Sequence, residues 1–129
     1  MDALLNIISN LGSPKIMVIG DFMLDKYVWG EVKRISQEAP IPVINVSSED
    51  VRPGGAGSVV NNLQTLGAQV LACGIIGDDA HGHTLMNILH GMGVDTAGII
   101  IDKSRPTIQK MRFMGHLQTA GKGVQQLLR

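Results

Sequence analysis

Two aspartates of this 129-residue chain have the type and spacing that sugar or polyol binding requires. Asp21 and Asp25 follow the apolar run 15–20, which predicts a buried strand. Carboxylates four residues apart can accept hydrogen bonds from neighbouring hydroxyls and so hold a polyol in one orientation. We therefore predict ligand binding by Asp21 and Asp25 just past the end of that strand. The alternative is that one of them caps a helix.

The glycine-rich segment 52–58, Arg-Pro-Gly-Gly-Ala-Gly-Ser, leads directly into an apolar helical pattern. Gly54 and Gly55 carry no Cβ, so hydroxyl or phosphate oxygens can approach their main chain, and a helix start adds unpaired N–H groups. The segment lacks the Gly-Lys-Ser/Thr ending of a Walker loop and the Gly-x-Gly-x-x-Gly order of a dinucleotide fingerprint. We predict a ligand-binding loop, with a purely structural turn as the alternative.

Composition places the chain among ordinary soluble single domains. Apolar residues make up 44% of it, and 11 Lys plus Arg balance 11 Asp plus Glu. Few aromatics and no basic run argue against nucleic-acid binding. The first residues lack the basic flank of a signal peptide and the length of a membrane span, which predicts a cytoplasmic protein without membrane contact. Cys73 lies in an apolar run and is expected to be buried and unreactive.

The order of apolar patterns predicts an α/β fold with parallel strands. Helical spacing covers residues 4–11, 59–66 and the stretch after Asp79 to Met92, and apolar runs at 70–76 and 99–101 predict further strands. Residues 107–113 are a candidate fourth strand. The segment from about 27 to 51 is expected to form strands of a small flap outside the main sheet.

Asp78 and Asp79 stand ahead of the second predicted helix, with His81 and His83 just inside it. Residues two apart on a helix do not face each other, so a zinc site is not favoured and no metal site is predicted. Capping of the helix by Asp78 or Asp79 is the better interpretation.

Six short motifs in order carry a resemblance to a known family. They are IGDFMLDKY (19–27), RISQEAPIPV (34–43), RPGGA (52–56), GDD (77–79), GVDT (93–96) and SRPT (104–107). Together they resemble the ribokinase-like (PfkB) carbohydrate kinases, most of all the branch that phosphorylates D-glycero-β-D-manno-heptose 7-phosphate on the way to ADP-heptose and lipopolysaccharide. The resemblance extends from about residue 4 to the last residue.

The resemblance implies a ribokinase-like, Rossmann-like parallel sheet flanked by helices, with residues 27–51 as a β lid. It implies that Asp21 binds sugar hydroxyls and that Gly54 and Gly55 line the sugar pocket. Arg52 would be a partner for the phosphate already on the substrate, because a guanidinium binds phosphate in a bidentate way. Lys110 and Arg112 are weaker candidates for that contact. A solvated surface charge is the alternative for all three cations.

The sequence departs from the family pattern in two places. Ser58 occupies a substrate-binding position where relatives usually have Asn, which shortens or removes one contact. No Gly-Ala-Gly-Asp segment, which supplies the family's catalytic base and anion hole, occurs in the sequence. We therefore assign no catalytic residue and expect a sheet truncated on its C-terminal side.

These departures bear on whether residues 1–129 can bind ATP and catalyse phosphoryl transfer on their own. ATP and Mg²⁺ would serve the complete enzyme, and we expect neither to be fully bound by residues 1–129, so the chain alone should be inactive. The alternative is a non-catalytic sugar or sugar-phosphate binding module or a gene fragment. A dinucleotide-dependent oxidoreductase fits the α/β pattern but not the missing fingerprint. Lids of such kinases often pair, so a homodimer through the lid is expected, and open sheet edges predict self-association or poor solubility.

Overall fold

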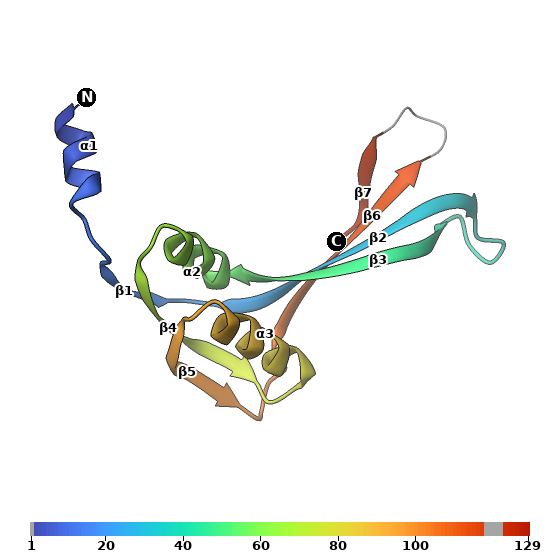
Figure 1. Cartoon of the computed structure of the whole chain (residues 1–129). Helices are drawn as coiled ribbons and strands as arrows, with labels where there is room; N and C mark the ends of the chain where they lie inside the picture. Colours follow the sequence, from blue (N-terminus) through green and yellow to red (C-terminus); the bar gives the residue numbers. More distant parts are fainter. Residues whose placement is uncertain (1, 118–122) are drawn as a thin grey trace. The chain divides into compact units, whose positions relative to one another are not determined.

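The computed structural model describes residues 2–117 and 123–129, and the chain separates into two compact units (Figure 1). Met1–Met23 and Pro53–Ile108 form the first, which we call the α/β unit. Leu24–Arg52 and Gln109–Arg129 form the second, which we call the β unit. Strands β2 and β3 belong to both, because each begins or ends in the α/β unit.

Three parallel strands form the sheet of the α/β unit, as the sequence predicts. They are β1 (Lys15–Ile19), β4 (Gln69–Gly77) and β5 (Asp95–Asp102), in the order β1-β4-β5. Ile16 pairs with Val70 in the first ladder, and Gly74 pairs with Ile99 in the second. Apolar runs without alternation form these strands because a parallel sheet normally has both faces covered.

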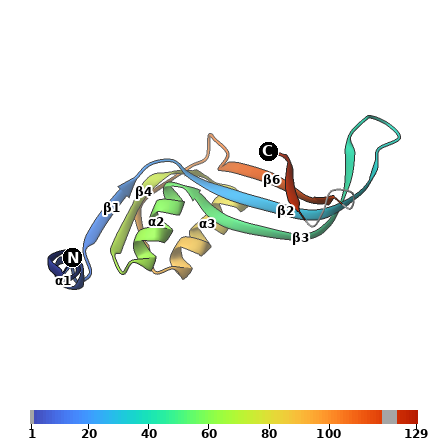
Figure 2. The ribbon, with the colours of Figure 1, turned by 90° about the horizontal axis from the view of Figure 1, so that it is seen from above.

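Two helices cover one face of this sheet (Figure 2). Helix α2 (Ala56–Thr65) packs on β1 and β4, and α3 (Ala80–Gly91) packs on β4 and β5. Both connections step in the same direction across the sheet, and right-handed crossovers then place both helices on the same side. The buried apolar residues of this unit are Phe22, Val60, Ala68, Val70, Ala72, Ile76, Leu85, Leu89 and Val94.

The opposite face of the sheet carries exposed apolar side chains, and we call it the open face. Met17 is 58% exposed, Ile19 75% and Ile100 62%. Residues of β4 alternate, so Val70 and Ala72 are buried under the helices while Cys73 points to the open face and is half-exposed. The expectation that Cys73 is buried is therefore wrong, because no described residue covers this side of the sheet.

The β unit is a four-stranded sheet in the order β3-β2-β6-β7. Its strands are β2 (Phe22–Ile35), β3 (Pro42–Gly55), β6 (Ile108–Leu117) and β7 (Val124–Leu128), and β6 and β7 are antiparallel. Together, strands β2 and β3 begin before and end after the segment 27–51 that the sequence assigns to flap strands. The candidate strand 107–113 does form, as β6, but it lies in this sheet and not in the parallel one. Strand β7 has no counterpart in the prediction.

Helix α1 (Asp2–Ser9) precedes β1, and its apolar side chains are exposed, with Leu4 at 67% and Ile7 at 62%. None of the helices in the described part of the chain has the length and hydrophobicity needed to cross a membrane.

Candidate functional site

The backbone of Asp21 joins the carboxyl end of β1 to the start of α2. The Asp21 carbonyl accepts a 2.9 Å hydrogen bond from Ala56 N, and Gly20 N donates to the Cys73 carbonyl at 3.1 Å. Phe22, the next residue, is fully buried. These contacts fix the main chain on both sides of Asp21 while its side chain stays exposed. The carboxylate is thus held at the carboxyl ends of the strands, where open parallel sheets bind ligands.

Gly55 is the residue that allows this close approach. Its φ of +58° lies in the left-handed region that favours glycine, and a Cβ at this position would overlap the Asp21 carbonyl oxygen. Gly54 beside it is buried, whereas Gly55 is exposed. The structure therefore brings together Asp21, Gly54 and Gly55, which the sequence singles out.

The segment 52–58 is not a loop. Its first four residues end strand β3, and helix α2 begins immediately at Ala56, so the prediction of a loop is wrong. No side chain caps α2, and its first turn holds no acidic residue. Exposed Ser58 donates a 3.1 Å hydrogen bond to the Pro53 carbonyl, so this hydroxyl braces the strand-to-helix turn. The uncapped helix start leaves a positive dipole end beside Asp21.

Asp25 lies within β2 and belongs to the β unit. The prediction that Asp25 follows β1 directly is wrong, and so is the capping alternative for Asp21 and Asp25, because a strand and not a helix begins at Phe22. Asp25 Oδ1 lies 3.3 Å from Arg112 Nη1, and the two side chains are only 16% and 18% exposed. Neither of these two buried atoms makes a hydrogen bond to the rest of the described chain.

Tyr27 connects the predicted phosphate contacts of the β unit. The Arg112 guanidinium carbon lies 5.0 Å from the centre of the Tyr27 ring, and that of Arg52 lies 5.5 Å from it. Both distances are in the range of cation–π attraction. The Trp29 ring stacks beside Tyr27, with centroids 6.4 Å apart. The sequence pattern does not single out Tyr27 as a site residue, although positions 25, 27 and 29 of one strand must share a face.

Arg52 and Lys110 differ in their surroundings. Arg52 is 68% exposed and its Nε donates a 2.6 Å hydrogen bond to Asp50 Oδ2, an ion pair of the weak surface kind. Lys110 is half-exposed and lies two residues before Arg112 on β6, so alternation puts both on the same face of that strand. The three predicted cations therefore belong to the β unit, whereas Asp21 belongs to the α/β unit.

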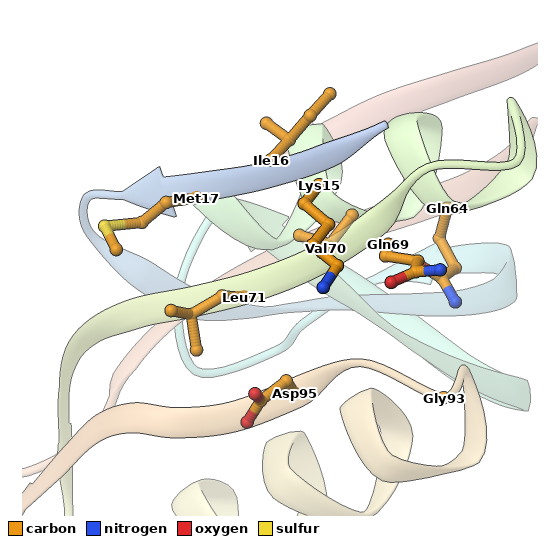
Figure 3. A pocket seen from close by; sticks show the side chains of 9 residues that line it. All are labelled: Lys15, Ile16, Met17, Gln64, Gln69, Val70, Leu71, Gly93 and Asp95. Atoms are coloured by element: carbon orange, nitrogen blue, oxygen red, sulfur yellow. The ribbon is translucent and has the colours of Figure 1, made fainter. Parts of the chain in front are cut away.

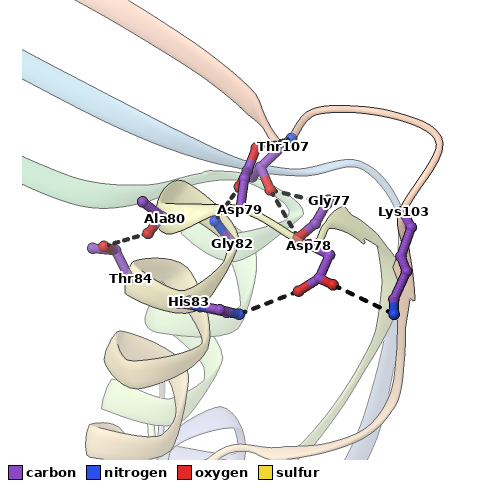
Figure 4. A network of polar contacts seen from close by, with 9 residues as sticks. All are labelled: Gly77, Asp78, Asp79, Ala80, Gly82, His83, Thr84, Lys103 and Thr107. Atoms are coloured by element: carbon purple, nitrogen blue, oxygen red, sulfur yellow. Dashed lines mark hydrogen bonds and ion pairs between the residues drawn. The ribbon is translucent and has the colours of Figure 1, made fainter.

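A second polar network closes the start of α3 (Figure 4). Asp79 Oδ1 accepts from Gly82 N at 2.7 Å, which confirms the predicted cap, and Oδ2 accepts from Thr107 N at 2.9 Å. The buried hydroxyl oxygen of Thr107 in turn accepts from Gly77 N at 2.9 Å. One carboxylate thus ties the helix start to the segment that precedes β6.

Electrostatics agrees with this structural role. The Gly82 N–H, followed by the Thr107 groups, lowers the pKa of Asp79 to about 2. Neighbouring Asp78 instead forms exposed ion pairs, with His83 Nε2 at 3.4 Å and Lys103 Nζ at 3.9 Å. No group of three metal-ligating side chains occurs within residues 2–117 and 123–129.

A hollow of about 670 Å³ lies at the amino ends of the parallel strands, opposite the carboxyl ends where Asp21 is found (Figure 3). It is lined by the first residues of the three strands, Lys15, Gln69 and Asp95, together with Met17 and Leu71 among others. Because ligands of open parallel sheets bind at the carboxyl ends of the strands, we assign no function to this amino-end hollow.

Comparison with known proteins gives relatives of high identity. The chain is 53% identical over 102 residues to the bifunctional protein HldE of Helicobacter hepaticus, covering 79% of this chain and 21% of that protein. It is 46% identical over 112 residues to HldE of Wolinella succinogenes, covering 87% and 24%. The chain therefore spans less than a quarter of the length of these relatives.

Solved structures show the same fold at lower identity. Ribokinase of Arabidopsis thaliana, complexed with ribose and ATP, matches with a TM-score of 0.60 and 20% identity, over 90% of this chain and 36% of that one. Phosphofructokinase-2 of Escherichia coli, in complex with fructose-6-phosphate, gives 0.61 and 19%, over 92% and 36%. The fold is thus the ribokinase-like α/β fold. The model of the pfkB family of carbohydrate kinases matches residues 13–119, and the chain belongs to that family.

Proposed function

We propose that this chain supplies acceptor recognition in an ATP-dependent kinase that phosphorylates heptose 7-phosphate at its 1-hydroxyl, toward ADP-heptose and lipopolysaccharide. The identity of 42–53% to proteins named HldE supports this substrate class. The observation that carries the proposal is the junction of Asp21 with Gly55, at the carboxyl end of β1 and the start of α2.

The chemistry of this junction suits a sugar. The Asp21 carboxylate can accept hydrogen bonds from two adjacent hydroxyls, and unpaired N–H groups of the α2 start can donate to hydroxyl oxygens. Rigid backbone contacts on both sides of Asp21 hold that geometry before the ligand arrives, which lowers the entropic cost of binding. Asp21 therefore orients the acceptor and takes no part in phosphoryl transfer.

Phosphoryl transfer belongs to groups that this chain does not provide. In the complete enzyme ATP with Mg²⁺ would supply the phosphoryl group. The described residues fit neither, because they include no Walker loop and no cluster of metal ligands. With no Gly-Ala-Gly-Asp segment in the sequence, we infer that residues 1–129 bind acceptor without turnover.

Calorimetry with heptose 7-phosphate tests the proposal. The charged hydrogen bonds of Asp21 are worth about 1.5–3 kcal/mol, so Asp21→Asn should weaken binding roughly 10–100-fold. Glu38→Gln, an equal charge change at an exposed position, should leave the affinity unchanged. Equal affinities in wild type and Asp21→Asn would refute the assigned site.

An ATP-coupled assay separates the kinase fragment from the alternatives. Residues 1–129 should show binding without ADP production, and clear turnover would contradict the division of labour proposed above. A coding segment for Gly-Ala-Gly-Asp in the DNA after Arg129, in any frame, would favour the kinase, whereas saturable binding without such a segment would favour a non-catalytic binding module.

A further inference from the structure

Strand β1 has one hydrogen-bonded neighbour in the described part of the chain, β4, so its other side is a free edge of the parallel sheet. Two bonds show how its main chain is oriented: Gly20 N donates to Cys73 O at 3.1 Å, and Pro14 O accepts from Gln69 N at 2.8 Å. In a parallel ladder both polar groups of one residue point to the same side, and successive residues point to opposite sides. The even-numbered residues of β1 therefore bond to β4, and the odd-numbered residues point their N–H and C=O groups to the free edge.

The odd-numbered residues of β1 are Lys15, Met17 and Ile19, and their side chains share the open face of the sheet. Met17 is 58% exposed and Ile19 75%, and Lys15 is exposed as well. Figure 3 shows Lys15 and Met17 on this strand. Unpaired main-chain groups and exposed side chains thus belong to the same three residues of one short strand.

The edge at β1 lacks the features that usually keep sheet edges from pairing, which are prolines, β-bulges and charges. It contains no proline, its ladder with β4 has no register shift, and its single charge, Lys15, is its first residue. Strand β5, at the other edge of this sheet, has a register shift in its ladder with β4 and an aspartate at each end, Asp95 and Asp102. Of the two edges, β1 is therefore the one more open to a further strand.

A second copy of β1 is complementary to this edge. In antiparallel pairing centred on Met17, Met17 of one copy faces Met17 of the other, and Lys15 of each copy faces Ile19 of the other. All three outward-pointing residues then exchange hydrogen bonds, whereas a shift by two residues leaves only two such pairs. The Cα atoms of the two Lys15 residues lie about 14 Å apart along the strands, farther than the Debye length of about 8 Å. The net charge of the chain is zero, so two copies do not repel each other at long range.

We propose that the free edge of β1 binds a second copy of this chain, whose β1 pairs antiparallel with it around Met17 and joins the two parallel sheets into one continuous sheet. The twofold axis is perpendicular to the sheet, so both open faces lie on one side and both pairs of helices on the other. Met17 and Ile19 of the two copies then form one apolar surface. The contact uses the same edge of both copies, so it closes at a dimer. It lies in the α/β unit and is distinct from pairing through the lid.

Cross-linking of single-cysteine variants tests the pairing register. Each variant also carries Cys73→Ser, so that the added thiol is the only one. A short bis-maleimide should join Met17→Cys to itself as a covalent dimer. It should join Lys15→Cys to Ile19→Cys in a mixture, but neither of these two to itself. Ile100→Cys, an exposed position on β5, is the control and should stay monomeric at protein concentrations where sedimentation shows nothing larger than a dimer.

Two charge substitutions separate pairing in this register from general hydrophobic association. Met17→Lys places two ammonium groups directly opposite each other and should raise the Kd of the dimer at least about tenfold. Ile19→Glu instead faces Lys15 of the other copy and should keep the Kd within about threefold of wild type. Both substitutions remove an apolar side chain that is more than half exposed, so association through apolar surface alone would weaken in both. Sedimentation equilibrium measures the Kd, and circular dichroism verifies that each variant is folded.

Four results would overturn the proposal. A wild-type chain that stays monomeric has no such contact, and a wild-type dimer in which Met17→Cys does not cross-link has its contact elsewhere. Equal loss of the dimer in Met17→Lys and Ile19→Glu would show association through the open face alone. A covalent heterodimer of Met17→Cys with Ile100→Cys would show β1 paired with β5 of the next copy.

Discussion

Gly55 has no side chain, and this determines where the main chain of Asp21, and with it the Asp21 carboxylate, can lie. Its positive φ turns the end of β3 into the first turn of α2, and the absent Cβ lets Asp21 O accept the Ala56 amide. Any other residue would both strain the backbone and push the Asp21 main chain away from α2. The position of Asp21 thus depends on a residue 34 places later in the chain.

Replacing Gly55 by alanine should therefore harm stability and ligand binding together. We expect Gly55→Ala to lower the free energy of unfolding by about 1–3 kcal/mol, the range of backbone strain at such positions. Gly91→Ala is the matched control, since a Cβ there meets nothing within 4 Å and alanine favours the helix. Urea unfolding measures the free energy of unfolding of both variants. A wild-type value for Gly55→Ala would contradict the role assigned to the Gly55 turn.

The sites of single residues could be predicted from the sequence where they depend only on neighbouring residues in the chain. Asp21 and the glycine pair follow from the strand end and the helix start. Asp25 was misplaced because the chain continues directly into β2, although buried Phe22, Leu24 and Val28 alternate with less buried neighbours as a strand would. Contacts between Tyr27 and two distant arginines could not be predicted, because they depend on the order of strands in the sheet.

Among the elements, α3 is tied to its surroundings by one carboxylate. Asp79 satisfies the Gly82 amide of the first turn and the Thr107 amide 28 residues later. The hydroxyl oxygen of Thr107, a residue only 5% exposed, accepts a hydrogen bond from the amide of Gly77 at the end of β4. The start of the helix, the end of β4 and the segment before β6 therefore depend on one ionised group.

The ionisation of Asp79 predicts an acid-dependent loss of stability. The folded-state pKa is about 2, below the ordinary 3.8, so this contribution is fully present above about pH 4 and is lost as the pH falls toward 2. The melting temperature should fall less steeply over this range in Asp79→Asn than in wild type, while Asp78→Asn keeps the wild-type slope. The pKa of Asp102, lowered by the Ser104 hydroxyl and amide, leaves a residual slope in all three. Parallel slopes in wild type and Asp79→Asn would contradict the stabilising role of the ionised Asp79 carboxylate.

The parallel strands and the two helices that cover them could be predicted because β1, β4 and β5 are apolar runs separated by helical patterns. Strand β6 could not be assigned to its sheet from the apolar order alone. Its alternation, with Lys110 and Arg112 between Met111 and Phe113, is nevertheless the pattern of a sheet with one face in water. Period, more than hydrophobicity, separates the strands of the two units.

At the scale of the whole molecule, the helices of the described chain cover the sheet of the α/β unit on one side only. A parallel sheet with helices on one face leaves Met17, Ile19, Ile75 and Ile100 in water, and β1 stands at an edge of its sheet with unpaired backbone groups. Exposed contiguous apolar surface drives association.

Self-association of the purified chain should follow from this face. Sedimentation velocity should show a concentration-dependent rise in mass for wild type and less of it for Ile100→Lys, a change at a side chain already 62% exposed. Leu66→Lys, at an 81% exposed position after α2, is the control and should associate like wild type. A monomeric wild type that melts cooperatively would contradict the expectation.

The half-exposed sulfur of Cys73 makes the open face measurable without any mutation. It is the chain's single thiol, it sits in the middle strand, and Gly98 beside it has no side chain to shield it. Its rate of reaction with a thiol reagent therefore reports, in real time, whether anything has come to rest on the sheet. Slowing of that rate on addition of a second polypeptide would show where it docks, so an apparently ordinary cysteine becomes a built-in footprinting probe.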